Sequence, residues 1–118
     1  MDNNDFKQSP IFTKSSDFLL WLLNHTGKFP KSERFRMAKR LEDSAFSFYE
    51  LLIEATRSTR RKRQLLVQAD VELEKLRLYM RISQAHKLTS LPQYHFSSGE
   101  LVEIGKLLGG WMKNLPET

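Results

Sequence analysis

The chain has 118 residues, enough for one domain with one hydrophobic core and too few for two. Its 40% hydrophobic and 28% charged residues predict a folded chain, and the absence of cysteine excludes disulfides, thiol nucleophiles and cysteine-ligated metal sites. Lys and Arg number 19 against 14 acids, a net charge of +5, which favours polyanionic partners. Neither a membrane-spanning apolar run nor a secretory signal is recognisable, so we expect a cytoplasmic protein without membrane contact.

The first predicted helix covers about Ser16 to Lys28. A serine cap and Asp17 mark its beginning, and Gly27 followed by Pro30 marks its end. Its apolar residues point all round the axis, so this helix must be covered on more than one side. We expect residues 1–12 to form a mobile tail and residues 13–115 to form the folded domain.

The second predicted helix, about Glu33 to Arg57, has Ser32 as its expected N-cap and Glu33 placed favourably against the helix dipole. Steps of three and four residues place a core stripe along it, and four more apolar residues widen that face. The stripe consists of Ala38, Leu41, Ala45, Phe48, Leu52 and Ala55, and beside it fall Phe35, Phe46, Tyr49 and Ile53.

The third predicted helix, about Arg60 to Leu88, carries two apolar stripes on roughly opposite sides. One monomeric bundle does not usually bury both, and each large aliphatic side chain left in water forfeits roughly 1.5 to 3 kcal/mol. We therefore predict self-association through the second stripe. The first stripe is Leu66, Ala69, Leu73, Leu76 and Met80, and the second is Val67, Val71, Leu78, Ile82 and Ala85.

The fourth predicted helix begins near Leu91–Pro92 and ends near Asn114. Gly105 and Gly109, one turn apart, indicate either close approach of another helix or a frayed last turn. Short polar connections favour antiparallel neighbours, so we predict an all-α, up-down-up-down four-helix bundle. Its one-sided apolar face contains Tyr94, Leu101, Ile104, Leu108 and Trp111.

No arrangement of residues indicates catalysis. His25, His86 and His95 lie on different elements, without the spacing of a helical metal site, and are expected to be satisfied or solvent-facing. No nucleophile elbow, phosphate-cradling glycine loop or dinucleotide fingerprint is present. We therefore expect no enzyme, no metal and no cofactor.

Positive charge is concentrated in residues 28–87, which hold fifteen basic and eight acidic residues, a local +7. The segment Arg57–Arg63 has five basic residues in seven and indicates either polyanion contact or a solvated turn. For Arg77 and Arg81, ion pairing with nearby acids and ligand contact are both open. A second basic group around the start of the second helix contains Lys28, Lys31, Arg34, Arg36, Lys39 and Arg40, and the first group is Arg57, Arg60, Arg61, Lys62 and Arg63.

Aromatic residues do not interleave with these basic runs as they do in base-stacking surfaces, and no sequence-reading helix is recognisable. We therefore expect contacts to RNA and DNA to be mainly phosphate contacts with little base specificity.

Four segments in this order resemble the accessory variability determinant proteins of diversity-generating retroelements: Phe29–Phe35 (FPKSERF), Glu50–Ala55 (ELLIEA), Glu72–Arg81 (ELEKLRLYMR) and Glu103–Trp111 (EIGKLLGGW). The resemblance implies a four-helix-bundle subunit of a barrel-like homopentamer with a positive surface. Tight subunit contacts in such a ring would account for Gly105 and Gly109 and for the second stripe of the third helix, and would place them in the oligomer interface. It also implies binding to a retroelement reverse transcriptase and to nucleic acid, in support of mutagenic copying of template RNA into cDNA.

Two functions from different classes follow. The first is a nucleic-acid-binding accessory subunit of a reverse transcriptase. The second is a self-assembling scaffold, similar to proteins encoded by intervening sequences in large-subunit ribosomal RNA genes, that binds RNA or an acidic protein partner. A neighbouring reverse-transcriptase gene with a template and variable repeat pair would distinguish them.

Overall fold

A computed structural model describes residues 9–116 of the chain. It contains four α-helices and one short 3₁₀ helix: α2 (Pro10–Thr26), η1 (Lys31–Glu33), α3 (Met37–Arg57), α4 (Lys62–Ala85) and α5 (Leu91–Lys113). None of the residues in 9–116 forms a strand, so the predicted all-α class is confirmed.

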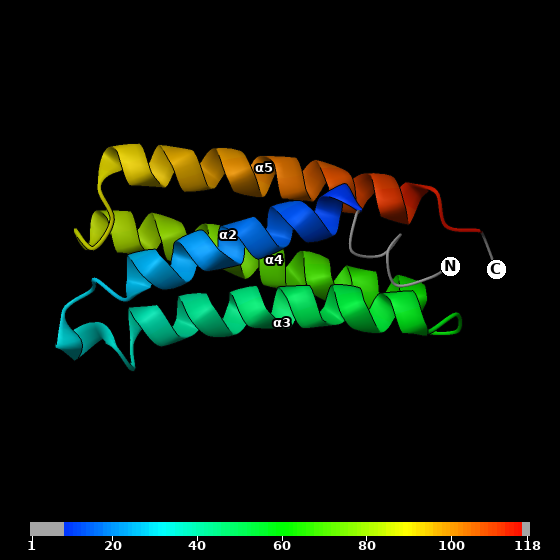
Figure 1. The fold of residues 1–118 in the computed structure, drawn as a ribbon, viewed down its shortest axis with the longest axis horizontal. Helices are drawn as coiled ribbons and strands as arrows, with labels where there is room; N and C mark the ends of the chain where they lie inside the picture. The colour runs from blue at the N-terminus through cyan, green and yellow to red at the C-terminus, as the bar shows by residue number, and fades with distance from the viewer. Residues whose placement is uncertain (1–8, 117–118) are drawn as a thin grey trace.

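The helices lie side by side along a body of 45 × 26 × 24 Å (Figure 1). α3 packs against α2 and α4, and α5 packs against α4 and α2, so each helix has two neighbours. The turn between α3 and α4 lies at one end of the body, whereas η1 and the connection between α4 and α5 lie at the other (Figure 1).

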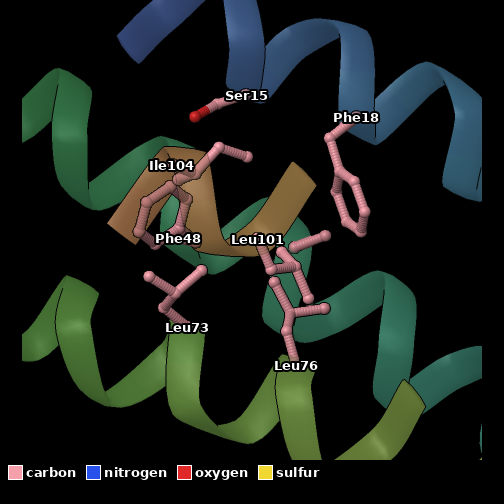
Figure 2. Close-up of a pocket in the computed structure, with 8 residues that line it drawn as sticks. Ser15, Phe18, Phe48, Leu73, Leu76, Leu101 and Ile104 are labelled. Atoms are coloured by element: carbon pink, nitrogen blue, oxygen red, sulfur yellow. The ribbon is translucent and has the colours of Figure 1, made fainter. Parts of the chain in front are cut away.

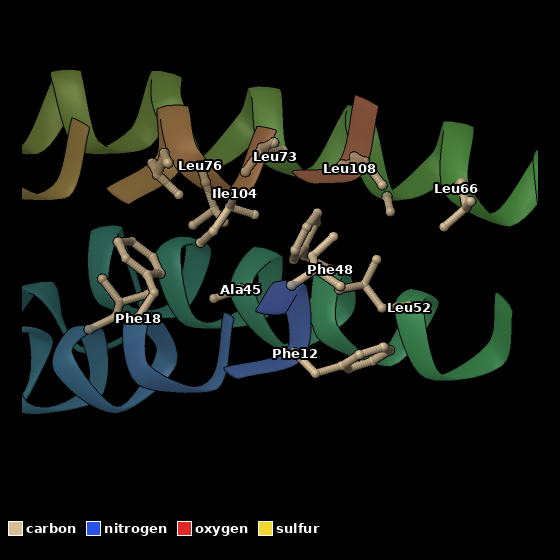
Figure 3. Packing of buried hydrophobic residues seen from close by; sticks show 14 of the residues in the cluster. Phe12, Phe18, Ala45, Phe48, Leu52, Leu66, Leu73, Leu76, Ile104 and Leu108 are labelled. Atoms are coloured by element: carbon tan, nitrogen blue, oxygen red, sulfur yellow. The ribbon is translucent and has the colours of Figure 1, made fainter. Parts of the chain in front are cut away.

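The core lies between the four helices, and both inward stripes predicted from the sequence are buried. All six stripe residues of α3 are buried, as are Leu66, Ala69, Leu73, Leu76 and Met80 of α4. Figure 3 shows how they meet side chains from the other two helices. Those partners are Ile11, Phe12, Phe18 and Leu22 of α2 and Leu101, Ile104 and Leu108 of α5.

The first helix begins earlier than predicted. α2 starts at Pro10, which occupies the first helical turn, where a missing N–H is tolerated. Ile11 and Phe12 are buried, and the Phe12 ring lies 5.7 Å from the Tyr49 ring in an edge-on contact. The predicted mobile tail is therefore wrong for residues 10–12, because all three lie in α2 and the side chains of Ile11 and Phe12 cover the core. Residues 1–8 of that tail lie outside the described residues.

The second predicted helix is divided. Residues 31–33 form η1, and α3 begins only at Met37, because Arg36 has φ −113° and ψ −103°, which interrupts the helical path. Glu33 is buried and does not lie in the first turn of α3 as predicted. Phe35 was placed beside the apolar face of this helix; it is instead 80% exposed, because it precedes the bend.

Connections account for the remaining differences. α4 is shorter than predicted at both ends, and Lys87, beyond its C-terminus, has a left-handed φ of 64°. α5 begins where predicted: Ser90 accepts a hydrogen bond from the Gln93 N–H, and the Gln93 side chain accepts one from the Ser90 N–H. This capping box fixes the start of α5.

One internal cavity interrupts the core beneath Ser15, between Phe18, Phe48 and Leu73 (Figure 2). Its volume is only about 10 Å³, roughly the space that one water needs. The Ser15 hydroxyl is buried and has no hydrogen-bond partner among the described residues. This cavity is a packing defect and is too small for a cofactor or substrate.

Candidate functional site

The two basic groups lie at opposite ends of the bundle. The set Lys28, Lys31, Arg34, Arg36, Lys39 and Arg40 is called the η1 basic group, and the set Arg57, Arg60, Arg61, Lys62 and Arg63 is called the turn basic group. α3 separates them, and a helix of its 21 residues spans about 30 Å. A ligand that contacts both groups of one subunit must therefore be extended.

The turn basic group results from an abrupt connection between α3 and α4. α3 ends at Arg57, Ser58 is extended, and the Arg61 N–H donates a hydrogen bond to the Ser58 hydroxyl at 3.0 Å. No ion pair within residues 9–116 involves any cation of this group. Among the described residues no ion pair compensates its charge, and all its members are exposed except the half-buried Lys62.

A cleft of about 240 Å³ opens beside this turn, where the C-terminal end of the described chain passes it. The Arg63 guanidinium donates a hydrogen bond to the Pro116 carbonyl at 3.5 Å, which holds the two segments together. α4 begins here with no side-chain cap, so the positive end of its helix dipole adds to the charge. The cleft is lined by Thr59, Arg60, Lys62, Arg63, Leu115 and Pro116.

The η1 basic group is partly compensated. Arg36 lies 3.3 Å from the Glu33 carboxylate, and Lys39 lies 2.9 Å from that of Asp43. Arg40 is placed over the Tyr79 ring, 6.0 Å from its centroid. Lys31 and Arg34 are exposed, and neither has an ion pair within the described range.

The remaining two predicted cations differ from each other. Arg77 pairs with Glu74 and donates a hydrogen bond to the Leu101 carbonyl at 3.5 Å, so it joins α4 to α5. Arg81 is exposed and has no ion pair among residues 9–116. The alternative of ion pairing left open by the sequence therefore holds for Arg77 and fails for Arg81.

The second stripe of α4 faces away from the core. Val67, Val71, Leu78 and Ile82 are 47%, 51%, 40% and 41% exposed. A methyl group added at Gly105 would lie 2.5 Å from the Arg77 guanidinium and 3.5 Å from Leu73, so this glycine leaves room for the flexible Arg77 side chain of the same chain. Gly109 lies in open space, where an added methyl group meets nothing within 4 Å.

The three histidines differ in burial and in their contacts. His25 is buried, stacks on Trp21 with centroids 4.8 Å apart, and is hydrogen-bonded through Nε2 to the Thr89 hydroxyl at 2.8 Å. Burial, together with the positive charge of Lys28, lowers the pKa of His25 below its usual value. His86 lies 3.4 Å from Glu33, and His95 is exposed.

A hydrogen-bond chain continues from His25. The Thr89 hydroxyl lies 2.8 Å from that of Ser83, which donates to the Met80 carbonyl at 3.0 Å. If the Ser83 proton points to Met80, Thr89 donates to Ser83 and His25 donates from Nε2, which fits a neutral imidazole. Within residues 9–116, no three His, Asp or Glu side chains are grouped to hold a metal, and no helix is long and apolar enough to cross a membrane.

Sequence reasoning missed one feature of the site. No aromatic residue was expected among the basic runs, but the exposed Phe35 lies between Arg34 and Arg36. The Arg-Phe-Arg order was readable in the sequence. It was overlooked because a continuous helix from residue 33 would have placed Phe35 beside the core stripe.

The fold and its charge distribution define a small helical bundle with basic ends. The family model described as bAvd-like matches residues 11–115, so the chain belongs to the bAvd-like family and the predicted resemblance is confirmed. The fold is also similar to a crystal structure of a protein of unknown function from the S23 ribosomal protein family of Bacteroides thetaiotaomicron. That similarity has a TM-score of 0.78 at 24% identity, over 88% of this chain and 99% of the other. A comparison with curated proteins gave no match.

Proposed function

We propose that this protein is a non-enzymatic accessory subunit of a diversity-generating retroelement, which binds the reverse transcriptase and holds template RNA or cDNA through its basic surface. Membership of the bAvd-like family supports the retroelement context. The observation that carries nucleic-acid binding is the turn basic group: five cations at one turn with no ion pair inside the described range. Phosphates compensate such charge and release counterions when they bind.

Binding is tested by removing charge from the turn basic group. A triple variant, Arg60→Gln with Arg61→Gln and Arg63→Gln, lowers the net charge from +5 to +2 but leaves Lys62 at the start of α4. Each lost phosphate contact should reduce the slope of log affinity against log salt by about 0.7 to 0.9. Fluorescence anisotropy with RNA and DNA at several salt concentrations measures the slope.

A matched control removes the same charge elsewhere. Lys14, Lys75 and Lys106 each pair with an acid, so changing all three to Gln also gives a net charge of +2. This control should keep most of the wild-type slope. If the slope falls equally in both variants, net charge and not the turn basic group governs binding. If the wild type binds no nucleic acid even at low salt, the scaffold function is favoured instead.

We also propose that the bundle is antiparallel, with up-down-up-down topology, and that it assembles into a ring-like homo-oligomer through the exposed stripe of α4. The expected oligomer is the pentamer that the resemblance implies. Leu78→Glu with Ile82→Glu should lower the mass measured by light scattering while helical circular dichroism is retained, because both side chains lie outside the core. Leu20→Glu with Val102→Glu, at exposed positions on α2 and α5, is the control. A wild-type protein of 13.9 kDa at micromolar concentration would contradict the proposal.

The reverse-transcriptase partner requires its own measurement. Co-expression with the reverse transcriptase of a diversity-generating retroelement should give a complex that co-elutes in size-exclusion chromatography after nuclease treatment. Co-elution that disappears with nuclease would show that nucleic acid alone joins the two proteins.

A further inference from the structure

Phe35 is the most exposed large hydrophobic side chain of the described residues, at 80%. It lies between η1 and α3 with Arg34 before it and Arg36 after it, both also exposed. An aromatic ring held in water between two cations has the composition of a surface on which nucleobases stack, since bases offer a flat face and their phosphates a negative charge.

The backbone holds this ring in a defined place. Arg34 N–H donates to the Lys31 carbonyl at 3.1 Å, and Arg36 N–H donates to the Glu33 carbonyl at 3.1 Å. The buried Glu33 side chain pairs with Arg36 at 3.3 Å and lies 3.4 Å from His86 of the α4 end. Phe35 is thus presented by an ordered turn, and binding through it requires little ordering of the protein.

A shallow, open depression lies beside Arg36, and Phe35 itself does not line it. This depression of about 320 Å³ is lined by Arg36 and Met37 from this segment and by Ile82, Ala85 and His86 from α4. Its lining combines apolar side chains with one cation and one imidazole.

The charge of this end selects among occupants. The η1 basic group has six cations. Glu33 and Asp43 pair with two of them, Arg36 and Lys39, and the other four have no ion pair among the described residues. A second copy of the same end would meet repulsion between like charges, whereas a nucleic-acid strand neutralises them. An unpaired base is the occupant that satisfies both the ring and its flanking cations.

We propose that Phe35 is a stacking platform for an unpaired base of single-stranded RNA or DNA, with Arg34 and the exposed Lys31 beside its phosphates. This proposal rests on the nucleic-acid binding proposed above and adds a preference to it. Bases within a duplex already stack on each other and do not offer a face to the ring. The η1 end therefore selects single strands, whereas the turn basic group contacts phosphates of either form.

The test compares single strands with a duplex on the full-length protein. Oligo(dT) and oligo(U) of about 12 nucleotides are the single-stranded probes, and a mixed-sequence duplex of equal length is the other. Phe35→Ala should weaken single-strand binding by roughly fivefold to a hundredfold and duplex binding by less than about twofold. The salt slope should stay unchanged, because no cation is removed.

Two further variants separate stacking from other roles. Phe35→Trp should retain or increase single-strand affinity, whereas Phe35→Leu, which keeps an apolar side chain but no flat ring, should lose it as Phe35→Ala does. Leu20→Ala, at a position 63% exposed on α2, is the control for loss of any exposed apolar side chain and should bind as wild type. Circular dichroism and light scattering measure the helicity and the mass of each variant.

The possible results distinguish failure of the stacking role from failure of nucleic-acid binding as a whole. Wild-type single-strand affinity in Phe35→Ala or Phe35→Leu overturns the stacking role while leaving nucleic-acid binding intact. Unchanged binding of all probes together with a lower mass, or with loss of co-elution with the reverse transcriptase, assigns Phe35 to a protein contact and overturns the proposal. Absence of any binding by wild type overturns the proposed function as well.

Discussion

The two ends of the bundle carry the same sign of charge but are built differently. At the η1 end, buried polar groups hold the segments together: Thr26 donates to the Glu42 carboxylate at 2.5 Å, and the His25–Thr89–Ser83 chain joins α2 to the α4–α5 connection. At the turn end, the cations have no ion pair within residues 9–116. Hydrogen-bonded polar groups give the η1 end a fixed shape, whereas cations without an ion pair leave the turn end available to an anion.

The largest effect should come from breaking the hydrogen-bond chain at the η1 end. Thr89→Val removes the partner of the His25 N–H and one partner of Ser83, and an unsatisfied buried donor costs roughly 1 to 3 kcal/mol. We expect a loss of about 2 kcal/mol in the free energy of unfolding, measured by urea denaturation. Thr59→Val, at the exposed turn, should change it by less than about 0.5 kcal/mol.

A smaller loss should follow removal of the buried charge of Glu33. Glu33→Gln keeps the side-chain size but weakens the contacts to Arg36 and His86; because both partners are more than half exposed, we expect only about 1 kcal/mol. Asp43→Asn removes a carboxylate that is itself exposed, in an i,i+4 pair with Lys39, and should cost about 0.3 to 0.5 kcal/mol. Equal losses in the two variants would show that the burial of Glu33 has no energetic consequence.

Acid should lower the free energy of unfolding through His25 at the η1 end. Because the pKa of His25 is lowered in the folded protein, folding favours the neutral imidazole, and that stability is present above the unfolded pKa of about 6.5. This stability is lost as the pH falls from about 6.5 through the lowered pKa of the folded protein. Urea denaturation at pH values on both sides of about 6.5 should show this loss in wild type and less of it in His25→Gln. An equal pH dependence in both proteins would exclude His25 as its source.

The smallest effect is expected at the turn end and has the opposite sign. The Arg60→Gln, Arg61→Gln, Arg63→Gln variant should gain a few tenths of a kcal/mol in low salt, because like charges no longer repel one another. The gain should disappear near 1 M salt, where the Debye length is about 3 Å. A loss of stability in low salt would mean that the Arg63 contact to Pro116 outweighs the repulsion.

Helical periodicity predicted the inward face of each long helix because burial of a stripe is a local property of spacing. The α3 and α4 stripes and the face of α5 around Leu101 and Ile104 are buried as predicted. The boundaries were less accurate, since Ser15 and Asp17 imitate a helix start inside α2. Ile11 and Phe12 are held in the helix by contacts with a core that no local pattern reveals.

Some features of the candidate site could also be predicted from the sequence, and others could not. The positions of both basic groups and the exposure of Leu78 and Ile82 were predictable, because charge runs and a surplus apolar stripe are visible in the sequence. The pairing of Arg77 with Glu74 fits their three-residue spacing, whereas Arg81 has no acid three or four residues away. Only the placement of α5, with its carbonyl at Leu101, adds a second hydrogen-bond partner for Arg77.

The sequence by itself determined the four helices, the core stripes and the concentration of positive charge in the middle of the chain, because these depend on residue type and spacing along one helix. Tertiary structure alone decided that Glu33 is buried against Arg36 and His86 and that Phe35 is left in water beyond a bend. The physical reason is that a residue at a chain reversal is placed by the elements it joins. His86 at the end of α4 supplies one partner for Glu33, and Phe35 precedes the bend at Arg36 and is left exposed.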